Sequence, residues 1–206
     1  MNTKLIKQFK NLNDKQKDLL TVNVIKGLVM DGVGNANSGH PGGPMSLADF
    51  TYILYSEFLI IDPKNPDWEN RDRVVLSVGH TCMLIYSILY LCGYLKIDDL
   101  KKFRQLGSLT PGHPEIKTPG IDANTGPLGQ GVGMGIGIAL AEKADSNTSK
   151  KRYTYILAGD GDLQEPIALG ASTLAGHWKL SNLIMFYDKN DIQIAGKTSR
   201  VDSTDY

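Results

Sequence analysis

Three short, continuously apolar stretches constrain the fold of this chain more than any other feature of its sequence. They read VVLSVGH (residues 74–80), YTYILA (153–158) and NLIMFYD (182–188). Apolar runs of this length are typical of strands that are buried on both faces of a parallel sheet. Because helical patterns lie before and between them, the sequence predicts an α/β domain with a parallel sheet flanked by helices.

The expected helices have apolar residues at helical spacing and cover residues 14–35, 45–60, 81–95, 98–106, 132–144 and 165–179. Residues 107–131 show no convincing period. Loops of that length inside compact domains are usually functional or disordered, and this one lacks the charge bias of disorder. The chain ends soon after the third strand, with a short extended piece at 192–196. We therefore expect one partial domain over residues 1–206, incomplete at its carboxyl end.

The balance of charge excludes some classes of partner. The chain has 22 basic and 22 acidic side chains, which gives no bulk electrostatic reason to expect nucleic acid or an acidic membrane surface. Its longest apolar stretch, VGMGIGIALA, is too short to span a bilayer, and its amino terminus lacks the apolar core of a signal peptide. Cys82 and Cys92 lie about 15 Å apart along one expected helix, too far for a disulfide. We expect free thiols and a cytoplasmic protein.

Each of the four histidines follows a glycine. His80 lies where a predicted strand meets a helix, and His40 and His113 lie in turns that a following proline stiffens. A lone Gly-His pair is usually an exposed loop residue, but a stiff backbone is also what a site needs to hold imidazoles in place. His177 falls near the end of an apolar helix, where we expect a structural role.

The sequence GDG ends the second predicted strand. Gly159 lets the chain turn, Asp160 projects from the carboxyl edge, and Gly161 leaves its N–H unshielded near a helix start. A helix amino terminus attracts phosphate, whereas a carboxylate repels it, unless a cation such as Mg²⁺ lies between them. Asn190 follows the next strand after one crossover unit. The two side chains are therefore expected at adjacent strand tips, as ligands of one Mg²⁺ ion.

This pattern resembles the thiamine-diphosphate fingerprint, and the rest of the chain resembles the transketolase family. The motifs NSGHPGGP, RDRVVLSVGH, TPGHPE, TGPLGQG, GDGDLQE and AGHWKLSNLIMFYDKN carry the resemblance, which covers residues 14–206. It implies the diphosphate-binding domain of a thiamine-diphosphate- and Mg²⁺-dependent enzyme. Such an enzyme transfers a two-carbon ketol unit between ketose and aldose sugar phosphates in the pentose phosphate pathway.

The resemblance also implies which residues bind the cofactor. The Mg²⁺ ligands would be Asp160, Asn190 and the carbonyl of Ile192. The contacts with thiamine diphosphate itself would come from His80, Gly126, Leu128, Gly161 and Asn190. Within that set, His80 and Gly161 would meet the diphosphate, whereas Gly126 and Leu128 would pack against the thiamine.

The catalytic roles follow from the same resemblance. His40, His80 and His113 would bind the donor ketose and move protons around its hydroxyls. Glu165 resembles a subunit-interface glutamate that joins two active sites in a hydrogen-bond relay, which implies an oligomer. Its alternative role is a carboxylate at a helix start, where the helix dipole favours negative charge.

Two local departures from the family pattern follow the metal motif. Asp162 stands at a position that is more often uncharged in the family, and Pro166 replaces a common glycine. A proline in the first helical turn is harmless. The extra carboxylate either weakens diphosphate binding or faces solvent.

The resemblance further implies a partner. Transketolases hold the cofactor between this domain and a second, pyrimidine-binding domain, which supplies the activating glutamate and most sugar-phosphate contacts. This sequence contains no counterpart of that domain. We expect a fragment or an amino-terminal subunit that a carboxyl-terminal part completes.

Other functional classes stay open at this point. The chain could be a cofactor-binding or assembly module without activity of its own. A zinc hydrolase could use the three loop histidines with Asp160, although no histidine pair has the short spacing of zinc ligands. Within the enzyme class, deoxyxylulose-phosphate synthase is the alternative that the segments PGHPE and GDGDLQE disfavour.

Overall fold

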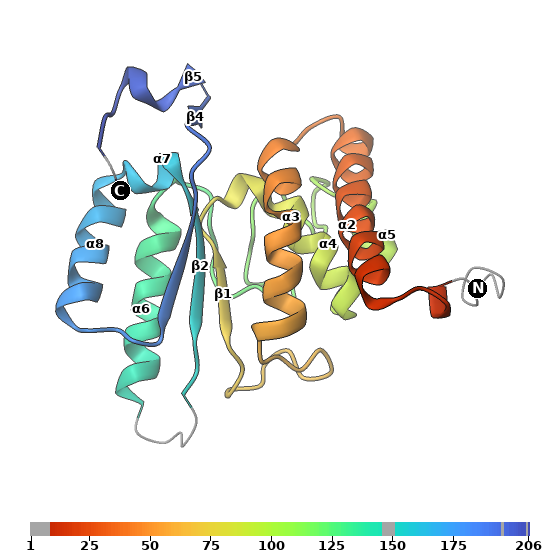
Figure 1. Cartoon of the computed structure of the whole chain (residues 1–206), viewed down its shortest axis with the longest axis horizontal. Coiled ribbons are helices and arrows are strands. Elements are labelled where there is room, and N and C mark those ends of the chain that lie inside the picture. Colours follow the sequence, from red (N-terminus) through yellow and green to blue (C-terminus); the bar gives the residue numbers. More distant parts are fainter. Residues whose placement is uncertain (1–8, 146–150, 195, 205) are drawn as a thin grey trace.

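The computed structural model describes residues 9–145, 151–194, 196–204 and 206, and its centre is a three-stranded parallel sheet (Figure 1). The strands are β1 (Arg73–Leu76), β2 (Thr154–Gly159) and β3 (Leu183–Asp188), in the order β1-β2-β3. This confirms the α/β class and the three strands. The expected burial on both faces holds for β2 but was wrong for β3, which lies at the edge of the sheet and is only half-buried. All carboxyl ends of the strands meet at one edge of the sheet, at the top of Figure 1.

Side chains alternate between the two faces of this sheet and so build two cores. On β2, Tyr155 and Leu157 belong to one buried cluster, whereas Ile156 and Ala158 belong to the other. Alternation is intrinsic to an extended strand. A strand that is apolar at every position therefore needs helices on both faces of the sheet.

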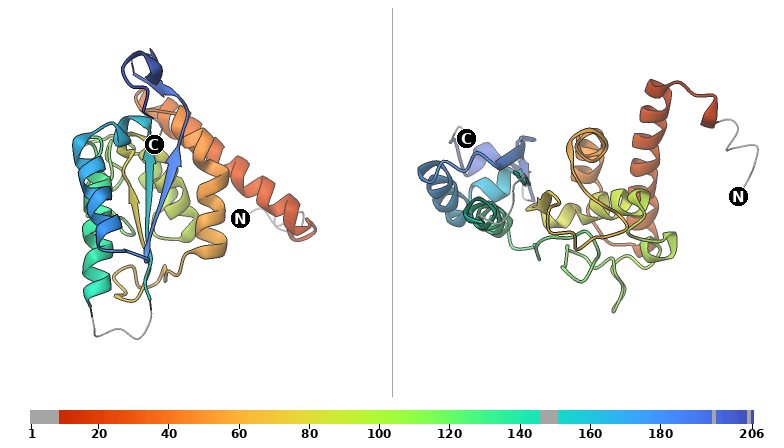
Figure 2. Two further views of the ribbon diagram at one scale, coloured as in Figure 1. Left: turned by 60° about the vertical axis from the view of Figure 1, so that its left-hand side comes forward. Right: turned by 90° about the horizontal axis from the view of Figure 1, so that it is seen from below.

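The helices supply both layers (Figure 2). Their bounds are α2 (Asp14–Ala36), α3 (Gly42–Ile53), α4 (Cys82–Cys92), α5 (Ile97–Leu100), α6 (Gln130–Ala144), α7 (Asp160–Leu163) and α8 (Pro166–His177). Helices α6 and α8 pack on one face of the sheet. Helices α3 and α4 pack on the other, with α2 outside them.

Helix α2 ends where the first histidine turn begins. Asn13 and Gln16 form a capping box at its amino terminus. At its other end Asn37 adopts a left-handed conformation (φ 46°), which asparagine tolerates better than most residues. The chain leaves α2 at the NSGHPGGP turn, which carries His40 and leads directly into α3.

Two expected segments differ from the structure. The prediction of a helix at 98–106 was wrong for the residues after Leu100, where α5 ends. Arg104 has a positive φ (61°), and its N–H donates to the carbonyl of Thr110 instead of continuing a helix. The helix expected at 45–60 begins earlier, as α3, and ends in a π-helical turn at Leu54–Phe58.

The carboxyl-terminal segment forms a small hairpin rather than one extended piece. Strands β4 (Ile192–Gln193) and β5 (Gly196–Lys197) pair antiparallel, and a 3-10 turn follows at Thr198–Arg200. Residue 195, within the expected extended piece, lies outside the described residues. The hairpin lies above α7, at the carboxyl edge of the sheet (Figure 1).

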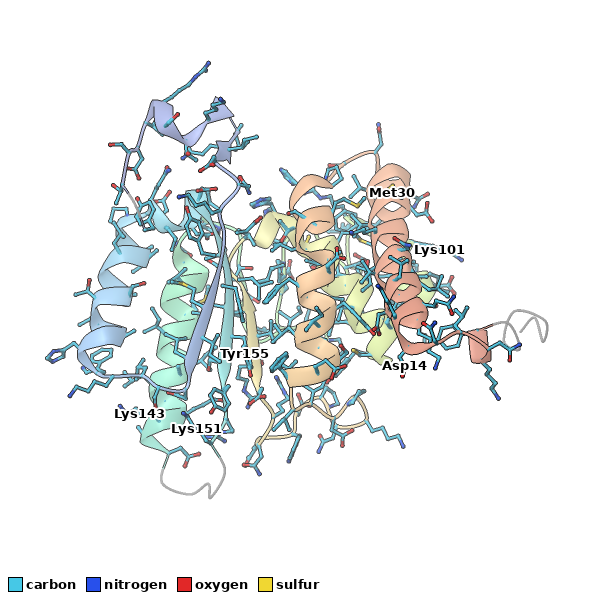
Figure 3. The ribbon with its side chains drawn as sticks, in the orientation of Figure 1. Asp14, Met30, Lys101, Lys143, Lys151 and Tyr155 are labelled. Atoms are coloured by element: carbon cyan, nitrogen blue, oxygen red, sulfur yellow. The ribbon has the colours of Figure 1, made fainter. Side chains whose placement is uncertain are left out.

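The opposite edge of the sheet anchors the long loop. Arg71 pairs with Asp122 at 2.6 Å, and Asp122 also accepts from the N–H of Val74 at the start of β1. Lys143 and Lys151 lie at this same end of the molecule (Figure 3). Within the part of the chain that the structure describes, no helix has the length and apolar character needed to cross a membrane.

Candidate functional site

The carboxyl edge of the sheet brings together the segments that carry the predicted site residues. Strand β1 leads into a 3-10 turn (Gly79–Thr81) that contains His80. Strand β2 leads into α7, which begins at Asp160, and β3 leads to Asn190. Gly159 pairs with Asp188 across β2 and β3, so Asp160 and Asn190 do lie at adjacent strand tips.

Asp160 is the central carboxylate of this edge. Its side chain is almost fully buried and accepts hydrogen bonds from the Tyr187 hydroxyl (2.5 Å) and from the N–H groups of Asn190 (2.9 Å) and Asp191 (3.0 Å). These donors are neutral, so hydrogen bonds rather than an ion pair with a described residue surround its negative charge. Burial, and then Asp160, raises the pKa of Tyr187.

The residues around Asp160 fit a hard divalent cation. The Asn190 amide oxygen accepts from the Ile192 N–H at 3.0 Å, so two of the three predicted ligands share one turn, and the N–H of Asn190 in that turn donates to the third, Asp160. A carboxylate, an amide oxygen and a backbone carbonyl are the oxygen ligands that Mg²⁺ takes. Among the described residues, no three His, Cys, Asp or Glu side chains gather as a metal site.

Gly161 and the loop residue Leu128 lie side by side. A Cβ atom added to Gly161 would be 3.0 Å from Cδ1 of Leu128. The absence of a side chain therefore lets the first turn of α7 lie directly against the segment that contains Gly126 and Leu128. This is the place where the sequence predicts the cofactor.

Asp162 does not face solvent. Its carboxylate is fully buried and accepts from the Ser77 hydroxyl (2.6 Å) and the N–H groups of Gly129 (2.8 Å) and Gly159 (3.1 Å). The expectation that it faces solvent was wrong. Asp162 instead ties the end of β1, the end of β2 and the loop that precedes α6 to one another.

We expect Asp162→Ala to lower the free energy of unfolding by about 3 kcal/mol, because two buried N–H groups lose their acceptor. Urea denaturation followed by circular dichroism measures the change. Asp31→Ala is the control, since Asp31 is an exposed carboxylate on α2, and its effect should stay within about 0.5 kcal/mol. Equal midpoints for both variants would contradict the linking role of Asp162.

The three loop histidines do come together. The rings of His40 and His80 meet edge-to-face with centroids 5.1 Å apart. A Cβ atom on Gly43, in the first turn of α3, would lie 2.6 Å from Thr81, so the two histidine turns pack tightly. The ring of His113 lies beside Gly126, whose added Cβ would be 3.5 Å from it.

The environment of His80 and His113 favours neutral imidazoles. Burial and then the proximity of His40 lower the pKa of His80. Burial lowers the pKa of His113 as well, followed by Arg104 and His40. A neutral imidazole can accept a proton from a hydroxyl near pH 7.

His177 is exposed at the last position of α8, about 18 Å along that helix from Glu165.

Arg104 is a site residue that sequence reasoning missed. Its guanidinium donates to the Ser38 hydroxyl at 2.7 Å, and a Cβ atom on Gly112 would be 3.2 Å from its Nε. It thus joins the turn that carries His40 to the loop that carries His113. No sequence signal marked it, because we placed it on an exposed helix that the structure does not contain.

Glu165 lies at the rim of the site, as the N-cap of α8, with Pro166 at the first helical position. A Cβ atom on Gly129 would be 2.6 Å from the Cβ of Glu165, so the side chain of Glu165 packs against the loop that contains Gly126 and Leu128. Among the described residues its carboxylate has no hydrogen-bond partner. This position is compatible with both the relay and the helix-start role.

The edge therefore combines two chemical capacities. Oxygen ligands beside an open helix start suit an anionic group that is bound through a cation. The neutral imidazoles of His80 and His113 suit proton transfer on a hydroxylated substrate.

Comparison with known proteins gives this arrangement a family. Residues 17–206 match the family model described as transketolase, thiamine diphosphate binding domain. Transketolase 1 of Saccharomyces cerevisiae is 52% identical over 190 residues, which are 88% of this chain and 28% of that protein. Transketolase of Buchnera aphidicola is 54% identical over 184 residues, 85% of this chain and 28% of that protein.

Solved transketolase structures are also similar to this chain. The Pichia stipitis transketolase in complex with sedoheptulose 7-phosphate has a TM-score of 0.88 and 48% identity, and the match covers 91% of this chain and 29% of that one. The Campylobacter jejuni transketolase has a TM-score of 0.86 and 50% identity, covering 89% and 30%. The chain thus spans less than a third of the length of the relatives that it matches.

Proposed function

This chain belongs to the transketolase family through its thiamine diphosphate binding domain, and we propose that it supplies the diphosphate- and Mg²⁺-binding wall of a transketolase active site. The observation that carries the proposal is the carboxyl edge of the sheet. There Asp160 and Asn190 lie at adjacent strand tips, and the three loop histidines gather beside them.

The residues would divide the work as follows. Asp160, Asn190 and the carbonyl of Ile192 would hold Mg²⁺, and Gly161 and His80 would contact the diphosphate. When bound, thiamine diphosphate supplies the electron sink that lets a two-carbon ketol unit leave one sugar phosphate and join another.

The histidines would handle the protons of the sugar. The lowered pKa values of His80 and His113 favour the neutral forms, which can accept a proton from a ketose hydroxyl and return it to the product. Their rigid turns would keep the imidazoles at fixed distances from that hydroxyl. The Pichia stipitis relative solved with sedoheptulose 7-phosphate supports sugar phosphates as the substrates.

The rest of the site would come from a carboxyl-terminal part with a pyrimidine-binding domain. The oligomer that we propose follows from the family resemblance of Glu165, and the chain covers 28% of its Saccharomyces cerevisiae relative. The free cysteines fit a reducing compartment, and we propose a cytoplasmic enzyme of the pentose phosphate pathway.

We expect residues 1–206 alone to show no ketol transfer above the blank, because one wall leaves the thiamine rings in water. The completed enzyme is this chain fused to the region that follows the matched segment in the Saccharomyces cerevisiae relative. It should convert xylulose 5-phosphate and ribose 5-phosphate when thiamine diphosphate and Mg²⁺ are present. A coupled spectrophotometric assay of both proteins measures this difference, with cofactor omission as the control.

The outcomes separate the alternatives. Robust transfer by the chain alone contradicts the need for a partner. Cofactor binding without transfer in the completed enzyme supports the silent binding module instead. Loss of both cofactor binding and transfer in a folded completed enzyme contradicts the proposed function.

A further inference from the structure

Helix α4 lies beneath the loop that carries His113, and two of its side chains reach the backbone of that loop. The Tyr86 hydroxyl is 3.0 Å from the carbonyl oxygen of Pro111 and 3.1 Å from that of His113. Cys82, one turn earlier on α4, directs its Sγ to the Gly112 carbonyl at 3.1 Å. Three consecutive carbonyls of the loop therefore face the same helix.

Both side chains are permanent donors. Tyr86 and Cys82 are fully buried, and burial raises the pKa of the Cys82 thiol to about 12 and that of Tyr86 well above its ordinary value. At neutral pH the thiol and the phenol therefore keep their protons. The single phenolic proton is shared between the carbonyls of Pro111 and His113.

These contacts matter because they hold the stretch that follows Thr110, whose carbonyl accepts from the Arg104 N–H at 2.9 Å. Among the described residues, Tyr86 and Cys82 provide all the hydrogen bonds to the backbone of residues 111–113. The next anchor along the chain is the Thr125 N–H, which donates to the Pro114 carbonyl at 3.2 Å. The imidazole of His113 is exposed above this anchored backbone.

We propose that Tyr86 and Cys82 are positioning residues for ketol transfer. Their hydrogen bonds to the backbone of residues 111–113 fix the position and orientation of the His113 imidazole. The inference rests on the proposed role of His113 at the substrate. A displacement of about 1 Å in a catalytic group can cost about 10²-fold in rate, so removing the anchor should reduce turnover while the cofactor site stays intact. Both side chains are fully buried beneath the loop, so they would act through His113.

Tyr86→Phe tests this in the completed enzyme, because it removes the hydroxyl and keeps the ring that packs edge-to-face on Phe103. We expect kcat for ketol transfer to fall about 10- to 100-fold, with thiamine diphosphate affinity within about two-fold of the parent. Amide hydrogen exchange of residues 112–118 should become faster.

Two controls lie on the same helix. Ser87→Ala removes a buried hydroxyl whose hydrogen bond stays within α4, on the Met83 carbonyl. Tyr90→Phe removes a hydroxyl that has no hydrogen-bond partner among the described residues. Both variants should keep kcat and loop exchange near the parent values. A Tyr86→Phe enzyme that matches these controls would overturn the inference.

A double-mutant cycle with His113→Ala separates positioning from general destabilisation. If Tyr86 acts through His113, Tyr86→Phe should cause almost no further loss of kcat in the His113→Ala background. An equal loss in both backgrounds refutes the inference while leaving the role of His113 intact. Parent-like activity of His113→Ala alone refutes the proposed role of His113, and this inference with it.

Cys82 provides an independent variant in case Tyr86→Phe fails to fold. Cys82→Ala should lower kcat several-fold, and Cys82→Ser, which keeps a donor, should recover part of that loss. No difference between the alanine variant and the parent, in kcat or in exchange of the loop amides, contradicts the role of Cys82.

Discussion

We expect Asp160→Ala to weaken thiamine diphosphate binding in the presence of Mg²⁺ by more than about 100-fold in the completed enzyme. Asp160 is the one carboxylate among the three predicted metal ligands. It is the first residue of α7, and it accepts from the Asn190 N–H of the neighbouring turn. Without its charge, the ion would lose its strongest protein ligand, and the diphosphate would lose the ion. Titration calorimetry measures the affinity, and circular dichroism verifies the fold.

The control for this variant is Asp191→Asn. It removes a negative charge from the same turn, and asparagine tolerates the positive φ of that position (60°). Its cofactor affinity should stay within a few-fold of the parent. Unchanged affinity in Asp160→Ala would reject Asp160 as a metal ligand. Equal losses in both variants would show that the turn needs overall negative charge rather than this particular ligand.

His113→Ala should lower kcat for ketol transfer by about 10²- to 10⁴-fold while cofactor affinity changes little. His113 is an exposed residue whose ring is partly desolvated by its neighbours, and this desolvation, followed by Arg104, lowers its pKa. The ring lies beside Gly126. These features suit a group that exchanges protons with the sugar. Steady-state kinetics with xylulose 5-phosphate and ribose 5-phosphate measures the loss.

His177→Ala provides the matched control, because His177 is an exposed imidazole at the far end of α8. It should retain parent-like kcat and KM. Activity of His113→Ala within a few-fold of the parent would make His113 an ordinary loop residue. A loss of cofactor affinity as large as the loss of kcat would place it at the cofactor rather than at the sugar.

Several features of the site were predictable because they depend on local sequence. An apolar strand followed by GDG indicates a turn at the carboxyl edge, and one crossover unit later the next strand must end nearby, which predicted Asp160 and Asn190 as neighbours. The prolines after His40 and His113 indicated rigid turns. The structure places all these segments together, and the catalytic roles drawn from the family resemblance stay predictions.

Other features depended on contacts between residues far apart in the chain. Asp162 accepts a hydrogen bond from Ser77, 85 positions away. The sequence suggested a carboxylate at the surface or near the metal, whereas this contact makes Asp162 a buried residue that joins β1 to β2. Arg104 reaches Ser38 across 66 positions. Tyr86 looks like one more apolar residue of a buried helix, and only the course of the loop above it gives its hydroxyl a partner.

The sequence by itself determined the α/β class, the strands, most of the helices and the residues that the family resemblance assigns to cofactor and substrate. Periodicity and glycine or proline turns are local, so the type of each element could be inferred without knowing its neighbours. The burial of β3 could not, because β3 lies at the edge of the sheet, where Met185 is exposed. The tertiary structure alone decided which polar groups partner Asp162, Arg104 and Tyr86. A buried polar group needs a partner wherever the fold brings one, and sequence distance does not reveal where that is.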